Sequence, residues 1–275
     1  KLLDEVMTSH SHPVGRRKAL IDVCRTRWAA RHDAYSHFYL VYSWIVPSLE
    51  VIAFWAHQDL YSKDVTLGWE LKYKAEANSL LISITSFEFI VTFLTVYNFL
   101  SHLEGITVKL QSSSLDIIEA YGMINDIKAL YRDLRIKIDE PSGPFAIVYQ
   151  QAIRIAESVG VTPSMPRIAK RCKQRANAPA ESIEEYYKRN VVIPFLDFIE
   201  SELNSRFVEH SQIAELICLV PSLLVSREAN IKNVIEFYEE DLPQPAVINQ
   251  ELFRWEHKWR NAVRSLPSTR ASTIK

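Results

Sequence analysis

One tryptophan of this sequence stands among arginines, a combination that can bind nucleic acid. The stretch Cys-Arg-Thr-Arg-Trp ends at Trp28 and is followed by Ala-Ala-Arg-His. An indole ring can stack on an unpaired base while neighbouring guanidinium groups hold phosphates. The same residues can instead pack into a helical core, with the arginines in ion pairs. The candidate nucleic-acid-binding residues of this stretch are Arg25, Arg27, Trp28 and Arg31.

A second candidate site lies in residues 161–181, called the basic segment below. It contains three prolines and five cations, and residues 161–180 include no acid. The prolines predict a linker between helical parts. Cations without acids can neutralise backbone phosphates, although a solvated loop or a nuclear import signal would have the same composition. Arg171, Lys173 and Arg175 complete the candidate nucleic-acid-binding residues.

Acidic residues are numerous, but their spacing assigns no catalytic role. Two-metal phosphoryl transfer needs several carboxylates that converge from different elements, and acids on amphipathic helices normally face water. The sequence contains no His-Glu-x-x-His, Gly-x-Ser-x-Gly or phosphate-loop motif and no Cys-x-x-Cys pair. We therefore assign no catalytic residue, no metal ligand and no cofactor to this chain.

The composition indicates an intracellular globular protein. Of the 275 residues, 48% are hydrophobic and 24% are charged, which permits a sizeable core and excludes disorder over the whole length. Six glycines are too few for the tight turns of an all-β fold. The net charge is -1, so nucleic-acid binding would have to come from local patches. Three widely separated cysteines indicate free thiols in a reducing compartment.

The most apolar stretch, Leu80 to Leu100, has three interpretations. Its length approaches the roughly 20 residues of a membrane span, but Glu88 and several hydroxyl side chains dilute it. A pair of central strands would suit its β-branched and aromatic residues. No Gly or Pro interrupts residues 71–104, and the stretch exceeds an ordinary strand. We favour a helix buried on most sides.

Hydrophobic periodicity predicts an all-α fold, a bundle of helices. The clearest helix covers residues 183–207, where Ser182 and Glu185 form a capping box and Pro194 predicts a kink or break. Pro47 is expected to divide another apolar region into two segments. The remaining predicted helices span residues 115–138, 145–159, 213–224, 230–238 and 249–263.

One single residue and one residue pair have a predicted structural role at a helix end and on a helix face. Ser142 can cap the helix that begins at Phe145. Trp255 and Trp259 are four residues apart, so they share one helix face and are expected to fasten the last helix to the rest of the protein.

Three blocks of the sequence resemble the hAT superfamily of transposases. They are Cys-Arg-Thr-Arg-Trp, the block SIEEYYKRNVVIPFLDFIESELNSRF at residues 182–207, and FYEEDLPQPAVINQELFRWEHKW at residues 237–259. In that superfamily a large helical insertion interrupts an RNase H-like catalytic core, and an Arg-Trp pair at its entry contacts DNA near the hairpin formed on cleavage. The resemblance implies this role for Arg27 and Trp28.

The resemblance also implies that this chain is incomplete for catalysis and is itself no enzyme. The final catalytic Glu of the superfamily lies in a Cys-Glu-Arg-x-Phe-Ser motif, which is absent from this sequence. A divalent metal is expected only in a complete parent transposase. The sequence begins without Met, so we expect a segment of a longer protein.

The function hypothesis is a nuclear, transposase-derived helical domain, active or domesticated, that supports DNA binding and subunit organisation. Three parts are expected: residues 1–160, the basic segment 161–181, and residues 182–275, which lead toward a dimerisation segment. DNA is the expected partner, with homo-oligomers of the parent protein and no membrane. The alternative is a domesticated protein-interaction scaffold, favoured by the near-neutral charge. A membrane protein is the third hypothesis.

Overall fold

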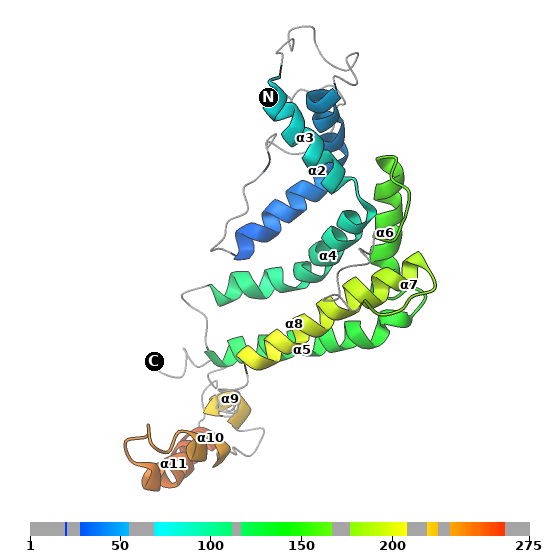
Figure 1. The fold of residues 1–275 in the computed structure, drawn as a ribbon. Helices are drawn as coiled ribbons and strands as arrows, with labels where there is room; N and C mark the ends of the chain where they lie inside the picture. Colours follow the sequence, from blue (N-terminus) through cyan, green and yellow to red (C-terminus); the bar gives the residue numbers. More distant parts are fainter. Residues whose placement is uncertain are drawn as a thin grey trace. The chain divides into compact units, whose positions relative to one another are not determined.

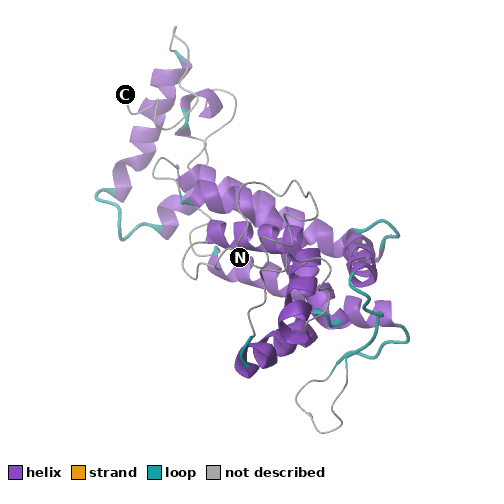
Figure 2. Cartoon of the chain, turned by 90° about the horizontal axis from the view of Figure 1, so that it is seen from above, coloured by secondary structure: helices purple, strands orange, loops and turns teal. Residues whose placement is uncertain are grey.

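Every regular element that the structure describes is a helix, and no strand occurs among those residues (Figure 2). The structure, a computed structural model, describes residue 20 and residues 28–54, 69–111, 117–166, 177–207, 219–224 and 232–261. The predicted all-α class is therefore confirmed. The helices (Figure 1) are α2 (Trp28–Phe54), α3 (Leu71–Ile84), α4 (Phe87–Leu110), α5 (Ile117–Ile136), η2 (Lys137–Asp139), α6 (Pro144–Ser158), α7 (Ile183–Tyr187), the π-helix η3 (Lys188–Val192), α8 (Ile193–Arg206), α9 (Pro221–Leu224), α10 (Lys232–Phe237), η5 (Pro245–Val247) and α11 (Ile248–Arg260).

The chain divides into two compact units. Unit 1 comprises Lys1–Thr107 and Tyr131–Phe198, and unit 2 comprises Val108–Leu130 and Ile199–Lys275. The residues on both sides of the undescribed stretch 167–176 thus belong to unit 1. The division into residues 1–160, 161–181 and 182–275 stays a prediction.

The core of unit 1 is held by buried tyrosines whose hydroxyls donate to helix carbonyls. Tyr42 of α2 donates to the Ile84 carbonyl at 2.6 Å, which joins α2 to the end of α3. Tyr131 is fully buried and donates to the Phe99 carbonyl of α4 at 2.5 Å. A buried hydroxyl without a partner would cost about 1–3 kcal/mol, so these bonds allow large rings to fill the core at no such cost.

The apolar stretch Leu80 to Leu100 is two helices and not one. α3 ends at Ile84 and α4 begins at Phe87. Thr85 donates its hydroxyl to the Leu81 carbonyl at 2.6 Å, and Ser86 accepts from the Phe89 amide at 3.2 Å. Hydroxyl side chains that bond nearby backbone groups compete with a continuing helix and cap the next one. The prediction that this stretch is helical is confirmed. The prediction of one continuous helix is wrong, because Thr85 and Ser86 interrupt it.

Pro47 does not divide the second apolar region, contrary to expectation. α2 runs unbroken from Trp28 to Phe54 with Pro47 inside it. Proline removes one backbone hydrogen bond in a helix. Here the helix is retained because Ile45, Val46 and Val51 on either side of it are buried, and burial of such side chains contributes roughly 1.5–3 kcal/mol each.

The ends of α6 are set by backbone geometry. Its N-cap is Gly143, without a side-chain bond, and Pro144 occupies the first turn. The predicted Ser142 cap is wrong, because proline has no amide to satisfy at that position. At the other end Gly160 has φ 68°, and the Val161 amide donates to the Ala156 carbonyl at 2.8 Å. This is a Schellman C-cap, which requires the left-handed conformation.

Near Pro194, where a kink or a break is predicted, the chain stays helical from Ile183 to Arg206, and the irregularity is a π-helix within that run. α7 gives way at Lys188 to η3, and α8 starts at Ile193. The Ile193 amide donates to the Lys188 carbonyl, five residues back. A proline ring clashes with the carbonyl four residues before it, and the wider π turn relieves this clash. Such π turns often occur at functional sites.

Two helices have the length and apolar character of a membrane span. They are Arg31–Phe54 and Phe87–Leu110. In the most apolar 18 residues of each, 39% and 33% respectively are buried. Core helices of soluble proteins meet the same criteria, so this finding is weak support for a membrane location.

Candidate nucleic-acid interface

The first turn of α2 contains the end of the predicted Arg-Trp site. Trp28 is the first residue of α2, and Arg31, which is half-buried, lies one turn further. Arg25 and Arg27 lie outside the described residues, and only the backbone of Trp28 is described. Positions 28 and 32 lie on the same face of a helix, so the surroundings of His32 show where this face of α2 packs.

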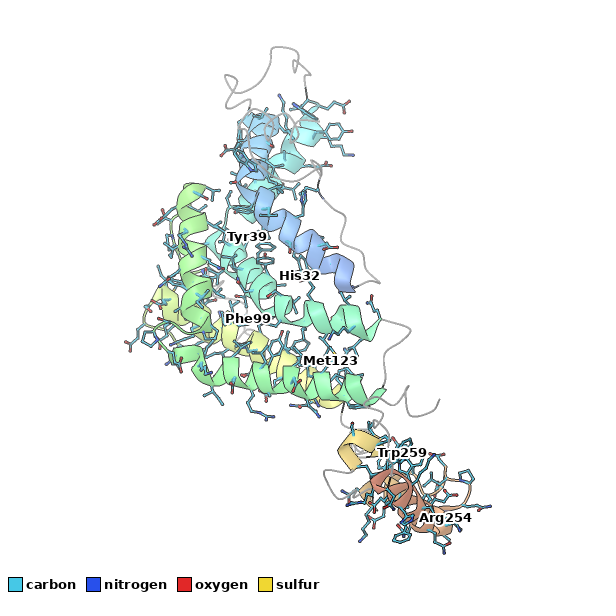
Figure 3. All side chains as sticks on the ribbon, turned by 180° about the vertical axis from the view of Figure 1, so that it is seen from behind. His32, Tyr39, Phe99, Met123, Arg254 and Trp259 are labelled. Carbon is cyan, nitrogen blue, oxygen red and sulfur yellow. The ribbon has the colours of Figure 1, made fainter. Side chains whose placement is uncertain are left out.

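His32 fastens this turn of α2 to the C-terminal half of α4. Its Nε2 lies 3.0 Å from Oε2 of Glu104 and 3.2 Å from the Ser36 hydroxyl. The imidazole stacks on the Tyr97 ring, with centroids 5.9 Å apart and planes 10° apart. Figure 3 shows His32 and Tyr39 between α2 and α4. The position of α2 relative to α4 is therefore fixed close to Trp28.

A row of half-buried rings continues from His32 along α4. The rings are stacked, with centroids 4.9 Å apart for Tyr39 and Tyr97, 6.1 Å apart for Tyr97 and Phe93, and 6.0 Å apart for Phe93 and Phe89. Rings four residues apart on one helix stack in this way by geometry alone. The row therefore packs α2 against α4, and its rings remain half-exposed.

The helix that follows the basic segment begins with the predicted cap. The Ser182 hydroxyl accepts from the Glu185 amide at 3.1 Å, which confirms the capping residue. The return bond differs from a standard capping box, because the Glu185 carboxylate accepts from the Glu181 amide at 2.8 Å. The cap therefore also holds the last residue of the basic segment.

Two buried tyrosines of α7 contact both sides of the basic segment. The Tyr187 hydroxyl donates to the Ser164 carbonyl at 2.8 Å, and Asn177 donates to the Tyr186 hydroxyl at 3.1 Å. The two rings meet edge to face with centroids 5.3 Å apart. Burial raises the pKa of the Tyr187 phenol above its ordinary value, and the nearby Glu88 adds to this. The phenol thus remains a neutral donor.

Asn190 and Arg189 complete the attachment on the C-terminal side. Asn190 accepts from the Ala178 amide at 2.6 Å and donates to the Ala178 carbonyl at 3.1 Å. Arg189 donates to the Pro179 carbonyl at 2.8 Å and pairs with Glu185 at 2.7 Å. Asn190 lies in the π turn η3. Residues 164 and 177–179 are therefore attached to one short piece of helix, residues 186–190.

The cations of the basic segment lie between these two attachments in the sequence. Arg167, Lys170, Arg171, Lys173 and Arg175 all fall in residues 167–176, outside the described residues. Asn190 and Arg189 could not be identified from the sequence, because no spacing rule identifies a side chain that binds backbone ten or twelve residues away. The only sequence signal is their position next to the two tyrosines.

The apolar side chains of residues 183–207 differ widely in burial. Tyr187 is fully buried and Leu196 nearly so, whereas Phe198 is 62% exposed. The Phe195 ring lies beside the Phe99 ring of α4, with centroids 6.2 Å apart. In unit 1 the ion pairs Arg135–Asp197 and Lys188–Asp139, both at 2.6 Å, add contacts between this helix and the α5–η2 region.

No metal centre is visible in the part of the chain that the structure describes. No group of three His, Cys, Asp or Glu side chains there could hold an ion. Several of the acids are instead paired with cations at four-residue spacing, as in Glu76 with Lys72 and Glu236 with Lys232.

In unit 2, a tryptophan attaches the last helix as expected. Trp255 of α11 donates its indole N–H to the Leu219 carbonyl at 2.9 Å, and Trp259 meets it edge to face at 5.5 Å. Lys258 lies over both rings, 5.3 and 4.8 Å from their centroids. Trp259 and Arg254 occupy different sides of α11 (Figure 3).

Comparison with known proteins gives one sequence likeness. The chain is 26% identical over 259 residues, or 92% of its length, to the human protein named 52 kDa repressor of the inhibitor of the protein kinase, and equally to the mouse protein of that name. It spans about a third of the length of these relatives, 32% and 33%. No family model matches the chain, and no solved structure does.

Proposed function

We propose that this chain is a helical domain derived from a transposase of the hAT superfamily, which binds DNA and organises subunits for a catalytic core located elsewhere. The likeness to the two repressor proteins covers 92% of the chain and agrees with the resemblance of its three sequence blocks. In this proposal the chain is not itself an enzyme, and any divalent metal belongs to a complete parent protein. The protein acts in the nucleus as part of a homo-oligomer.

The observation that carries the DNA-binding proposal is the attachment of the basic segment at both of its described ends. Tyr187 holds Ser164 on one side, and Asn190 holds Ala178 on the other. Five cations and no acid lie between these points in the sequence. Attaching both ends to one helix concentrates this charge at one place on a protein whose net charge is only -1. Local positive charge of this kind binds phosphates without sequence preference.

The first turn of α2 supplies the second contact of this proposal. His32 and the aromatic row hold the start of α2 against α4. The backbone at Trp28 therefore has a defined position next to α4. In the proposal Trp28 stacks on an unpaired base at a DNA end, and Arg25, Arg27 and Arg31 contact the adjoining phosphates.

Fluorescence anisotropy with labelled hairpin-ended duplex DNA, measured over a range of salt concentrations, tests the proposal. Each phosphate contact contributes about 0.9 to the slope of log K against log salt. Replacing Arg171, Lys173 and Arg175 by Ala is therefore expected to reduce the slope by about 2.7 and to weaken binding roughly 100-fold at 0.15 M salt. Trp28→Ala is expected to weaken binding to hairpin ends more than to blunt duplex.

A matched control removes the same charge elsewhere. Lys72, Lys137 and Lys232 are exposed, and each pairs with an acid four residues away in the sequence. Replacing all three by Ala should leave the slope nearly unchanged. The proposal is wrong if the two triple variants weaken binding equally, or if neither variant nor Trp28→Ala alters a measurable affinity.

The protein-interaction scaffold remains a second candidate because α3 exposes apolar side chains. Leu71, Leu80 and Ile82 are 85%, 55% and 64% exposed. Exposed apolar side chains gathered on one helix are a feature of interaction surfaces. Protein partners that survive nuclease treatment, and that are lost on Leu80→Glu and Ile82→Glu substitution, would favour this function over DNA binding.

A further inference from the structure

Thr162 has the chemical and structural features of a kinase substrate. It is followed by Pro163, and this is the only Ser-Pro or Thr-Pro pair in the 275 residues. Its side chain is exposed, and the backbone of residues 161–166 is neither helix nor strand. The Thr162 hydroxyl has no hydrogen bond to any residue that the structure describes, so no contact there protects it. The hydroxyl is available to a second protein.

Thr162 also lies between two fixed points of the backbone. On one side, Gly160 ends α6 with its left-handed conformation, and the Val161 amide donates a hydrogen bond to the Ala156 carbonyl. On the other side, the Ser164 carbonyl accepts from the Tyr187 hydroxyl. Gly160 directs the chain out of α6, and the hydrogen bond from the Tyr187 hydroxyl to Ser164 holds the following residues against α7. The exposed Thr-Pro pair is therefore displayed at a defined place, directly before the cations of the basic segment.

We propose that Thr162 is a phosphorylation site for a proline-directed serine/threonine kinase and that the phosphate weakens DNA binding by the basic segment. The first half depends only on Thr162 and its surroundings, and the second half rests on the proposed function. The Thr162 Oγ1 attacks the γ-phosphorus of ATP and forms an O–P bond. The bond from that phosphorus to the β–γ bridging oxygen breaks, ADP leaves, and the hydroxyl proton passes to the catalytic carboxylate of the kinase.

The effect on binding follows from charge. A phosphothreonine has a charge of about -1.5 to -2 at neutral pH, whereas the basic segment has five cations. The nearest of them in sequence, Arg167, is five residues away, which is at most about 17 Å of extended chain. A phosphate on Thr162 can therefore pair with cations that would otherwise contact DNA. Because Thr162 is exposed, its modification removes no packing from the core.

The magnitude corresponds to the loss of about two phosphate contacts. The slope of log K against log salt is expected to fall by about 1.8, and affinity to fall about 30-fold at 0.15 M salt. Acidic side chains near the segment act on both forms alike, because they are present before and after modification.

The experiment treats the full chain with a recombinant kinase of the mitogen-activated class and ATP. Mass spectrometry locates and quantifies the phosphate, and anisotropy with hairpin-ended DNA then compares the modified and unmodified protein. Stoichiometric phosphate at Thr162 is expected, with none in Thr162→Ala. Pro163→Ala should reduce incorporation at least tenfold while retaining the acceptor. Thr107 is a reference inside a helix, since its hydroxyl bonds the Leu103 carbonyl, and it should remain unmodified.

Each outcome decides one half of the proposal. Absence of phosphate at Thr162, while a Thr-Pro control peptide is modified, overturns the site. Full modification with unchanged affinity and unchanged salt slope overturns the regulatory role and leaves the site supported. If the unmodified chain binds no DNA, the proposed function fails together with the regulatory role, and the mass spectrum alone then supports or overturns the site.

Discussion

Replacing Asn190 by Ala is expected to detach the C-terminal side of the basic segment without unfolding unit 1. The side chain makes two hydrogen bonds to Ala178, at 2.6 and 3.1 Å, and one to the Tyr186 carbonyl of its own helix at 3.1 Å. A net contribution of about 0.5–1.5 kcal/mol per bond, taken near the lower end because the site is exposed, gives about 1–2 kcal/mol for the two bonds to Ala178. That corresponds to a five- to thirty-fold change in a local opening equilibrium.

Amide hydrogen exchange measures this opening directly. The Ala178 amide donates to Asn190, so its exchange should accelerate about five- to thirty-fold in Asn190→Ala. Amides in the centre of α6 should exchange at their original rate, because α6 does not depend on this contact. Replacing Asn by Ala inside a helix also gains up to about 0.7 kcal/mol of helix propensity.

Asn204→Ala provides the control for that gain. Asn204 lies in α8 and makes no hydrogen bond with its side chain to any described residue. Its substitution should leave Ala178 exchange unchanged and should slightly stabilise α8. The reasoning is refuted if Ala178 exchanges equally fast in the original protein and in Asn190→Ala, because the bonds to Asn190 would then contribute nothing to the attachment.

Three further predictions concern stability. Burial raises the pKa of the phenols of Tyr42, Tyr131 and Tyr187, so the folded state retains these protons above pH 10 while the unfolded chain loses them. The contribution of these tyrosines to stability should therefore be constant below about pH 10 and fall above it by up to about 1.4 kcal/mol per pH unit for each tyrosine. In urea titrations, the free energy of unfolding of Tyr131→Phe should fall less steeply with pH above 10, by up to about 1.4 kcal/mol per pH unit. Gly160→Ala should cost about 1–2 kcal/mol because its φ of 68° is left-handed. Gly105→Ala should instead gain roughly 0.5–1 kcal/mol, because Gly105 is an exposed residue in the C-terminal half of α4 with no atom within 4 Å of the added carbon. Thermal melts that shift in the same direction for both variants would contradict the account of the α6 cap. Trp255→Phe removes the bond to Leu219, and amides of α11 should then exchange about two- to twelve-fold faster, an effect that would be missing if the indole N–H contributed nothing.

Local signals in the sequence were sufficient for most helices but not for the tertiary contacts. Ser182 and Pro194 each act through neighbouring backbone, so a cap and an irregularity in the helix could be predicted from them. The break at Thr85 and Ser86 was missed, although its cause is also local, because hydroxyl residues inside an apolar stretch were read only as dilution of hydrophobicity. The local effect of Pro47 predicts a division of the helix, but the burial of side chains on both sides of it keeps α2 unbroken.

The candidate site was less predictable because its most important contacts join residues that are distant in sequence. His32 meets Glu104 and Tyr97 across more than sixty residues, and only the fold brings them together. Asn190 was invisible for the same reason. The predicted residues Arg25, Arg27, Arg171, Lys173 and Arg175 lie outside the described residues, so their roles stay predictions, as does the stacking role of Trp28.

The block that most resembles a transposase therefore has a physical reason for its residue types. Tyr186 and Tyr187 must be large enough to be buried in unit 1 while their hydroxyls still reach Asn177 and Ser164. Asn190 must offer both an acceptor to the Ala178 amide and a donor to the Ala178 carbonyl, and it lies in the π turn ahead of Pro194. Phenylalanine or leucine would fill the same space without holding the segment. A helix built only for packing has no need of these polar groups, whereas a helix that attaches both described ends of the basic segment uses every one of them.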